Sequence, residues 1–352
     1  MRRAQALLLA LALILLPAIW SGLAGGTAAL EISGAGATFP LPLLQAWAEA
    51  YRQEAGITVT YRATGSGNGL KRIAAGKVDF AVSDIPLDPA EALSADLIQF
   101  PLVVGGVVAV ANLAGAGGEV RLTGSLLADI LAARIGRWDD KAIGRLNPDR
   151  PLPPWPIVVV HRADPSGTTF LLTHYLAKVS PAWRQDPGVG SLVRWPGGIE
   201  AKGNEGVAAS VAATPGAIGY VEYDFAQRGG LVILSLQNRE GAYPRPERKS
   251  FQAAAANAAW GEGRDFSLLL TDQAGADSWP ITGASFVVMR RRPEHPATSL
   301  RLHAFLGWVY RDGREIAEDK DYAPVPSGMV ARIERDWSAL SEPELAAAQK
   351  DD

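Results

Sequence analysis

Three times in this 352-residue chain, an apolar run ends in a loop of glycine with serine or threonine, and a helix-forming stretch follows. The loops are Gly36-Ala37-Thr38-Phe39, Thr64-Gly65-Ser66-Gly67 and Asp164-Pro165-Ser166-Gly167-Thr168-Thr169. Between residues 30 and 87 the order is strand, helix, strand, helix, strand, with Gly56 and Gly76 as helix stops. Because strands joined by crossover helices lie parallel, this order predicts an α/β fold.

Each of these loops is suited to hold an anion. Backbone N–H groups at a helix N-terminus are exposed there beside a hydroxyl group. In parallel α/β sheets such loops lie at the carboxyl ends of the strands, where ligands bind. For any single loop the alternative is that the serine or threonine only caps its helix. Three such loops in one chain favour an oxyanion site.

Two charged residues near the loops could complete such a site. Arg162 could aim two N–H donors at an oxyanion while Asp164 fixes its orientation, although a surface Arg–Asp pair is the commoner explanation of this spacing. Asp84 would repel an anion unless the ligand donated a proton, so it would select hydrogen phosphate or dihydrogen phosphate over sulfate. A turn at Ser83-Asp84-Ile85-Pro86 explains the same residue equally well.

Two apolar runs indicate that the chain crosses twice between two bodies. The first run covers residues 100–112 and contains Gly105-Gly106, and the second covers residues 284–289. The region between them should contain strands at 157–161 and 217–221 and helices at 169–179 and 206–212, and a helix at 299–310 could return to the first body. This length suits two domains better than one, so we expect a hinged, two-lobed molecule.

The N-terminus is typical of a secretory signal peptide. Arg2 and Arg3 precede an apolar run at residues 6–20 and a small-residue stretch at 21–29. We expect residues 1–29 to be removed on export; the alternative is an N-terminal membrane anchor, for which the run is short. Gly26 stands where a lipoprotein requires an acylated cysteine, so no lipid anchor is expected.

Composition excludes several classes of function. The absence of cysteine rules out disulfides, thiolate nucleophiles and cysteine-containing metal sites. The four histidines are not spaced as metal ligands, and neither a P-loop nor a GxSxG motif occurs, so we expect no metal, no cofactor and no catalytic residues. The net charge is −3, becoming −5 after loss of the two arginines, which argues against nucleic-acid binding. Widely spread tryptophans, such as Trp47, Trp138, Trp195, Trp279 and Trp308, are interpreted as packing residues.

Short motifs follow one another in a characteristic order over about residues 30–337. They are Gly34-Ala35-Gly36-Ala37-Thr38-Phe39-Pro40, Val78-Asp79-Phe80, Ser83-Asp84, Phe100-Pro101, Gly105-Gly106-Val107-Val108, Trp138-Asp139-Asp140, Arg162-Ala163-Asp164, Ser166-Gly167-Thr168, Pro215-Gly216-Ala217-Ile218-Gly219-Tyr220-Val221-Glu222-Tyr223, Trp279-Pro280-Ile281-Thr282 and Asp321-Tyr322-Ala323. In these motifs the chain resembles the periplasmic phosphate-binding proteins of high-affinity phosphate ABC transporters.

The resemblance implies a type II periplasmic binding protein fold with a ligand cleft between hinged lobes. Lobe 1 would comprise residues 30–103 and 283–352, and lobe 2 residues 104–282. The implied phosphate-binding residues are Thr38, Phe39, Ser66, Asp84, Arg162, Ser166, Gly167 and Thr168, with Asp164 bracing Arg162. The resemblance further implies a non-enzymatic, periplasmic monomer that captures mono- or dibasic inorganic phosphate and delivers it to the permease subunits of an ABC transporter.

The chain departs from the family pattern at three places. The second loop, Gly65-Ser66-Gly67-Asn68-Gly69, lacks a common second serine; Pro165 replaces a common glycine and removes one N–H; and His161 precedes Arg162. Two other functions are compatible with parts of this pattern. A secreted phosphate-ester hydrolase would usually require a metal, for which no ligand cluster is evident. A binding protein for sulfate, molybdate or another oxyanion would not need Asp84.

Overall fold

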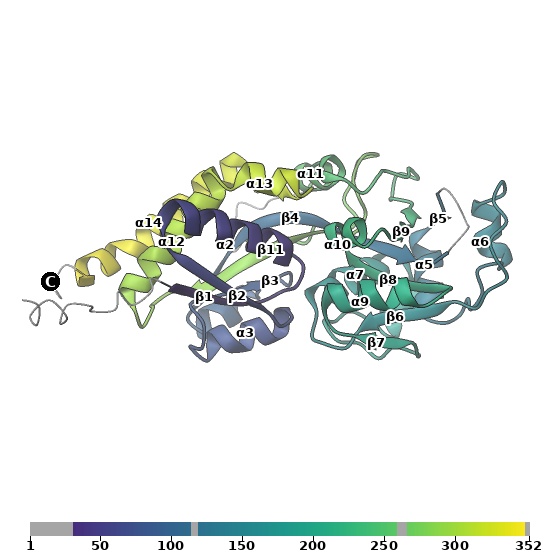
Figure 1. The fold of residues 1–352 in the computed structure, drawn as a ribbon, viewed down its shortest axis with the longest axis horizontal. Helices are drawn as coiled ribbons and strands as arrows, with labels where there is room; N and C mark the ends of the chain where they lie inside the picture. Colours follow the sequence, from purple (N-terminus) through teal and green to yellow (C-terminus); the bar gives the residue numbers. More distant parts are fainter. Residues whose placement is uncertain (1–30, 114–118, 259–265, 349–352) are drawn as a thin grey trace, which may run out of the picture.

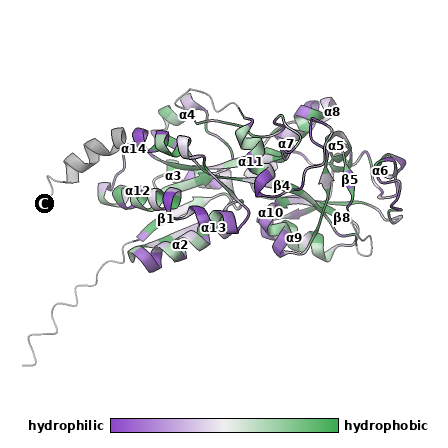
Figure 2. Cartoon of the chain, turned by 90° about the horizontal axis from the view of Figure 1, so that it is seen from above, coloured by the Kyte–Doolittle hydropathy of each residue, from purple (hydrophilic) through white to green (hydrophobic). Residues whose placement is uncertain are grey.

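The computed structural model describes residues 31–113, 119–258 and 266–348. The expected signal peptide, residues 1–29, lies outside these ranges. Within them the chain forms two lobes, each with helices packed on a twisted sheet (Figure 1). Figure 2 shows hydrophobic residues gathered on inward-facing sides, and hydrophilic residues on the outer faces of helices such as α2 and α13.

The elements separate by lobe. One lobe contains β1 (Glu31–Gly36), α2 (Leu41–Ala55), β2 (Thr58–Ala63), α3 (Ser66–Ala74), β3 (Phe80–Ser83), α4 (Pro89–Ser94), β11 (Thr282–Arg290), α12 (Pro296–Arg311), α13 (Arg314–Asp319), β12 (Ala323–Pro324) and α14 (Ser327–Ala348). The other contains β5 (Arg121–Leu122), α5 (Gly124–Leu131), α6 (Lys141–Leu146), β6 (Val158–Arg162), α7 (Gly167–Val179), α8 (Pro181–Gln185), β7 (Ile199–Ala201), α9 (Gly203–Ala213), β8 (Ala217–Glu222), α10 (Tyr223–Arg228), β9 (Val232–Ile233) and β10 (Ser235–Leu236). The long strand β4 (Leu97–Ala111) runs through both, and α11 (Arg248–Ala256) packs on it.

The order predicted for the N-terminal region is confirmed. Strand β1 pairs in parallel with both β2 and β3, so Gly36 lies beside Ala63 and Val82. Helix α2 ends at Gly56, whose φ of 69° is left-handed and therefore suits glycine. Helix α3 begins at Ser66, so the second half of the loop Thr64-Gly65-Ser66-Gly67 forms its first turn. The carboxyl ends of the three strands therefore meet at one edge of the sheet.

The same arrangement recurs in the other lobe. Strand β6 pairs in parallel with β7 and β8, which places the loops after Arg162 and Ala201 side by side. Strand β4 joins the two sheets, since it pairs antiparallel with β11 over residues 97–106 and with β8 over residues 107–111.

Buried aromatic side chains hold this framework. Trp47, Trp138 and Trp279 are almost fully buried, and each indole N–H donates to a backbone carbonyl, of Gly313, Gly216 and Val107 respectively. Burying an indole ring is favourable when its N–H finds an acceptor, as here. Packing in place of crosslinks therefore stabilises this cysteine-free chain, as its composition requires.

Candidate functional site

The predicted site residues converge where the two lobes face each other. Thr38 and Phe39 follow β1, Ser66 begins α3 after β2, and Asp84 follows β3. Arg162 ends β6, and the loop from Asp164 to Thr168 leads into α7. All of these residues are buried except Pro165, which is half-buried. We call the eight predicted ligand residues Thr38, Phe39, Ser66, Asp84, Arg162, Ser166, Gly167 and Thr168 the cradle.

Arg162 and Asp164 form a buried two-point ion pair. Nε of Arg162 donates to Oδ1 of Asp164 at 2.8 Å, and Nη2 donates to Oδ2. Their side chains are 1% and 8% exposed, so the surface-pair alternative is wrong. Burial by itself would raise the pKa of Asp164, but the hydrogen bonds and charge of Arg162 hold it below its ordinary value. Nη1 reaches Thr168 Oγ1 at 3.4 Å, so three of the five guanidinium N–H bonds are used and two remain for an anion.

Asp84 lies across the cradle from this pair. Its Oδ1 accepts from Ser285 Oγ at 2.6 Å, and its Oδ2 accepts from Ser66 Oγ at 3.5 Å. The turn that could have explained Asp84 is made by Ser83 instead, whose hydroxyl donates to the carbonyl of Ile85 and accepts from its N–H. Burial raises the pKa of Asp84 to about 7, although both hydroxyls and the charge of Arg162 act to lower it. An unliganded carboxylate is thus costly here.

Capping explains the hydroxyl at only one of the three loops. Ser166 caps α7 by accepting from the N–H of Thr169 at 3.1 Å, which still leaves its own hydrogen to donate. Helices α2 and α3 begin without any side-chain cap, so capping does not explain Thr38 or Ser66. The N-termini of α2, α3 and α7 nevertheless point their partial positive charge toward the cradle.

Contacts across the cradle are close. A Cβ placed on Gly167 would lie 2.4 Å from Asp84 Oδ2 and 2.5 Å from Ser66 Oγ. Gly67 donates its N–H to the carbonyl of Pro165 at 3.4 Å, and a Cβ on Gly67 would come within 2.9 Å of Pro165 Cβ. Two departures from the family pattern, the missing serine and the proline, therefore meet in space and fit each other.

His161 and Phe39 both point their side chains away from the cradle. His161 is buried and stacks on Trp195, with ring centroids 5.0 Å apart, and burial lowers its pKa. Because neighbouring residues of a strand face opposite sides, His161 lies on the face away from Arg162. Phe39 turns its ring toward Gly105 and Tyr322, and its carbonyl accepts from Tyr322 OH at 2.9 Å, so only its backbone N–H is available to a ligand.

Sequence reasoning missed three residues of this region. Ser285 comes from the middle of the apolar strand β11, where nothing in the sequence indicates a polar contact. Tyr220 is buried on β8. Its hydroxyl accepts from the backbone N–H of Arg162 at 3.2 Å and forms a hydrogen bond with Thr169 Oγ1 at 2.8 Å. Asn204 follows Gly203 at the start of α9, which repeats the strand–glycine–polar–helix order with an amide in place of a hydroxyl. That repetition was a usable signal.

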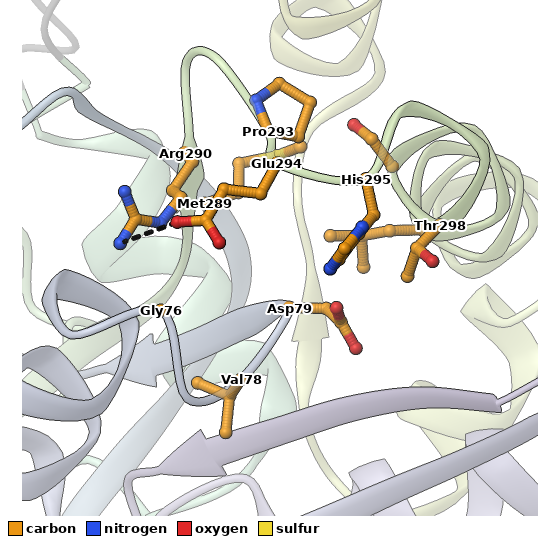
Figure 3. A pocket seen from close by; sticks show the side chains of 11 residues that line it. Gly76, Val78, Asp79, Met289, Arg290, Pro293, Glu294, His295 and Thr298 are labelled. Atoms are coloured by element: carbon orange, nitrogen blue, oxygen red, sulfur yellow. Dashed lines mark ion pairs between the residues drawn. The ribbon is translucent and has the colours of Figure 1, made fainter. Parts of the chain in front are cut away.

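A pocket of about 180 Å³ adjoins the cradle beside Thr38, Asp164 and Asn204. Another pocket in the described part of the chain lies away from the cradle, between the loop before β3, the end of β11 and the start of α12 (Figure 3). Asp79 in that pocket is already bound by the N–H and hydroxyl of Ser33, so its carboxylate serves the local fold.

Over the described ranges, no cluster of three or more histidine, aspartate and glutamate side chains could hold a metal ion. In the same part of the chain, no helix combines the length and apolar character needed to cross a membrane.

Known proteins are similar to this chain in sequence and in architecture. A family model described as the PBP superfamily domain matches residues 22–312. Phosphate-binding protein PstS of Pasteurella multocida is 42% identical over 325 residues, covering 92% of this chain and 94% of its own. PstS of Xylella fastidiosa is 43% identical over 314 residues, covering 89% and 86%.

Solved structures agree on the fold. A high-affinity periplasmic phosphate-binding protein (PfluDING) solved with bound phosphate superposes with a TM-score of 0.70 at 21% identity, over 87% of this chain and 93% of that one. A phosphate-binding protein from Stenotrophomonas maltophilia gives a TM-score of 0.67 at 22% identity, over 86% and 92%. The fold and the cleft thus define the class of two-lobed type II periplasmic binding proteins. Within that class, the chain belongs to the PstS family of phosphate-binding proteins.

Proposed function

We propose that this protein captures inorganic phosphate between its lobes and delivers it to an ABC transporter for import. The observation that carries the proposal is the buried Asp84, which faces a cradle otherwise built from N–H and O–H donors. A ligand that is both an anion and a proton donor can accept from the N–H and O–H groups and donate to Asp84 at the same time. Hydrogen phosphate and dihydrogen phosphate are such ligands. Sulfate offers no proton at neutral pH. The names of the curated relatives support the same ligand.

Each cradle residue has a specific role in this proposal. Thr38, Ser66, Ser166 and Thr168 donate hydroxyl hydrogens, while the backbones of Phe39, Gly167 and Thr168 donate N–H groups. Ser66 does so by exchanging its 3.5 Å bond to Asp84 Oδ2 for one to the ligand. Arg162 directs its two unused N–H bonds at the phosphate oxygens, and Asp164 holds the guanidinium plane in position. Asp84 accepts the proton of the ligand. With a net charge near −5 for the exported chain, these local dipoles and one arginine must attract the anion.

Binding proceeds by hinge closure in this account. We assign residues 30–103 and 283–352 to lobe 1 and residues 104–282 to lobe 2, a division supported by the change of partner of β4 from β11 to β8 after Gly106. Phosphate docks on the lobe 1 loops, and the loop from Ser166 to Thr168 then closes over it. Closure excludes water, which strengthens each hydrogen bond to the ligand.

The wider setting follows from the family. The protein is exported by residues 1–29, acts in the periplasm without a lipid anchor, and is a monomer that docks on the permease subunits of the transporter. It binds phosphate without turning over a substrate and needs no metal or cofactor. Support comes from the relatives, which are named for binding.

Calorimetric titration of the phosphate-stripped mature protein tests the proposal. Phosphate should bind tightly, sulfate should give no heat at comparable concentrations, and arsenate should compete with phosphate. Arg162→Ala should weaken phosphate binding by about 2–5 kcal/mol, because the buried anion would lose its charged partner.

The matched control is Arg137→Ala. Arg137 makes the same two-point contact with a carboxylate two residues on, Asp139, but these side chains are 55% and 39% exposed. Its removal should leave phosphate affinity unchanged. Tight sulfate binding without phosphate heat, or equal effects of the two arginine substitutions, would contradict the proposal.

A further inference from the structure

Asn204 connects the loops of both lobes although no predicted role falls on it. It is fully buried at the start of α9. Its side-chain Nδ2 donates to Thr38 Oγ1 at 3.1 Å and to Thr168 Oγ1 at 3.4 Å, and its backbone N–H also donates to Thr38 Oγ1 at 3.4 Å. One buried amide thus touches a cradle hydroxyl from each lobe.

The orientation of this amide is fixed by chemistry. Its Oδ1 accepts from the backbone N–H of Glu222 at 3.2 Å. A backbone N–H can only donate, so the atom facing it must be the amide oxygen, and the NH₂ group must then face the two threonines. Both amide hydrogens and the amide oxygen of this fully buried side chain are therefore committed.

The contacts of Asn204 restrict what the two hydroxyls can do. A hydroxyl has two acceptor lone pairs and one hydrogen. Thr38 Oγ1 accepts twice from Asn204, while Thr168 Oγ1 accepts once from Asn204 and once from Arg162 Nη1. In each case both lone pairs are occupied, and among the described residues neither hydroxyl hydrogen has an acceptor. Each hydrogen is left to point into the cradle.

We propose that Asn204 is a positioning residue that turns Thr38 and Thr168 into obligate hydrogen-bond donors and so tunes the cleft for a ligand rich in acceptor oxygens. The inference rests on the proposed binding of phosphate. Without Asn204 both hydroxyls could rotate and present lone pairs, which repel an oxyanion. With Asn204 they are oriented before the ligand arrives, which reduces the ordering that binding requires.

A double-mutant cycle tests this coupling, with phosphate as the titrant in calorimetry. Asn204→Ala alone should weaken phosphate binding about 10-fold, the loss typical of one well-placed hydrogen bond. In a Thr168→Val background the same change should cost clearly less, and likewise in Thr38→Val, because no hydroxyl remains there to orient. If Asn204→Ala lowered phosphate affinity by the same factor in the wild type, in Thr168→Val and in Thr38→Val, the inference would be overturned and Asn204 would have only a packing role.

Two further variants keep the test decisive. Asn204→Asp retains an acceptor for the Glu222 N–H and should keep the fold. Its second carboxylate oxygen would accept from Thr38 and Thr168 and so draw both hydroxyl hydrogens away from the ligand. The loss of phosphate affinity should therefore exceed that of Asn204→Ala, and it should be smaller in the Thr38→Val and Thr168→Val backgrounds. A loss no greater than that of alanine would contradict the proposal. Asn112→Ala is the matched control, since that amide donates to the carbonyl of Ala212 at 2.8 Å outside the cradle, and its phosphate affinity should match the wild type. If the wild-type protein itself failed to bind phosphate, the proposed function would be wrong. If the wild type bound phosphate but the effects of the Asn204 and threonine substitutions on affinity were independent, only the role of Asn204 would be refuted.

Discussion

Replacing Asp84 by asparagine should stabilise the ligand-free protein at alkaline pH while it weakens phosphate binding. Burial raises the pKa of Asp84 from 3.8 to about 7 in spite of the hydroxyls of Ser285 and Ser66 and the charge of Arg162. At about 1.4 kcal/mol per pKa unit, this rise corresponds to about 4 kcal/mol that the empty folded protein loses when the carboxyl group ionises. Part of the stability of the empty protein is thus given up for a proton acceptor in the cleft.

The direction of the pH dependence follows from the raised pKa. A carboxyl group with a higher pKa in the folded state holds its proton more tightly there, so its contribution is complete below pH 4 and is lost as the pH rises through about 7. Asparagine stays neutral and can still accept from Ser285. The free energy of unfolding of Asp84→Asn relative to the wild type should therefore grow by about 4 kcal/mol between pH 4 and pH 8.

Urea unfolding followed by tryptophan fluorescence, in phosphate-free buffers from pH 4 to pH 8, measures this difference. Asp139→Asn serves as control, because that carboxyl is at the surface and its pKa is lowered by the hydrogen bond from Arg137. It should show no such rise. If the difference in the free energy of unfolding between Asp84→Asn and the wild type were constant with pH, or grew toward low pH, Asp84 would not be the buried proton acceptor proposed for the ligand.

Three other substitutions probe the geometry of the cleft. Gly167→Ala should lower phosphate affinity at least ~100-fold in calorimetry, because its Cβ would lie 2.4 Å from Asp84 Oδ2 and force the two sides of the cradle apart. Unchanged affinity would mean that this loop does not need to lie against Asp84 for binding. Arg162→Lys should lower phosphate affinity about 10–100-fold even though the charge is kept, because an ammonium group cannot donate to Asp164 and to the ligand within one plane. Wild-type affinity in this variant would show that the planar guanidinium group is not required. Gly67→Ser should weaken binding, since its Cβ would come within 2.9 Å of Pro165, and adding Pro165→Gly should restore it; failure of that rescue would show that the two positions do not compensate.

Local patterns in the sequence predicted the three loops that form most of the cradle, and the family resemblance supplied its individual residues. A glycine loop with a hydroxyl residue between a strand and a helix is visible within a few residues, and parallel pairing places all such loops at one edge of the sheet. Thr38, Ser66 and Ser166 were found in this way. The same rule applied to an amide side chain would also have found Asn204, since it lies after Gly203 at the start of a helix.

Contacts between distant segments could not be predicted in this way. Ser285 meets Asp84 although they are 201 residues apart, and Asn204 meets Thr38 across 166 residues. Both contacts depend on how strand β11 and the second lobe sit against the first sheet, which no local pattern encodes. Likewise, the sequence could not decide whether Asp84 or Ser83 forms the turn, because both side chains can bond nearby backbone groups.

The most direct test of the central claim is the ratio of phosphate to sulfate affinity, measured by calorimetry at pH 8 for the wild type and for Asp84→Asn. If Asp84 reads the proton of the ligand, the wild type should favour phosphate at least ~1,000-fold, as sites built around a specific hydrogen bond do, and the substitution should reduce that preference by a factor of at least ~100. Comparable affinities for the two anions in the wild type, or a preference that survives in Asp84→Asn, would contradict the account.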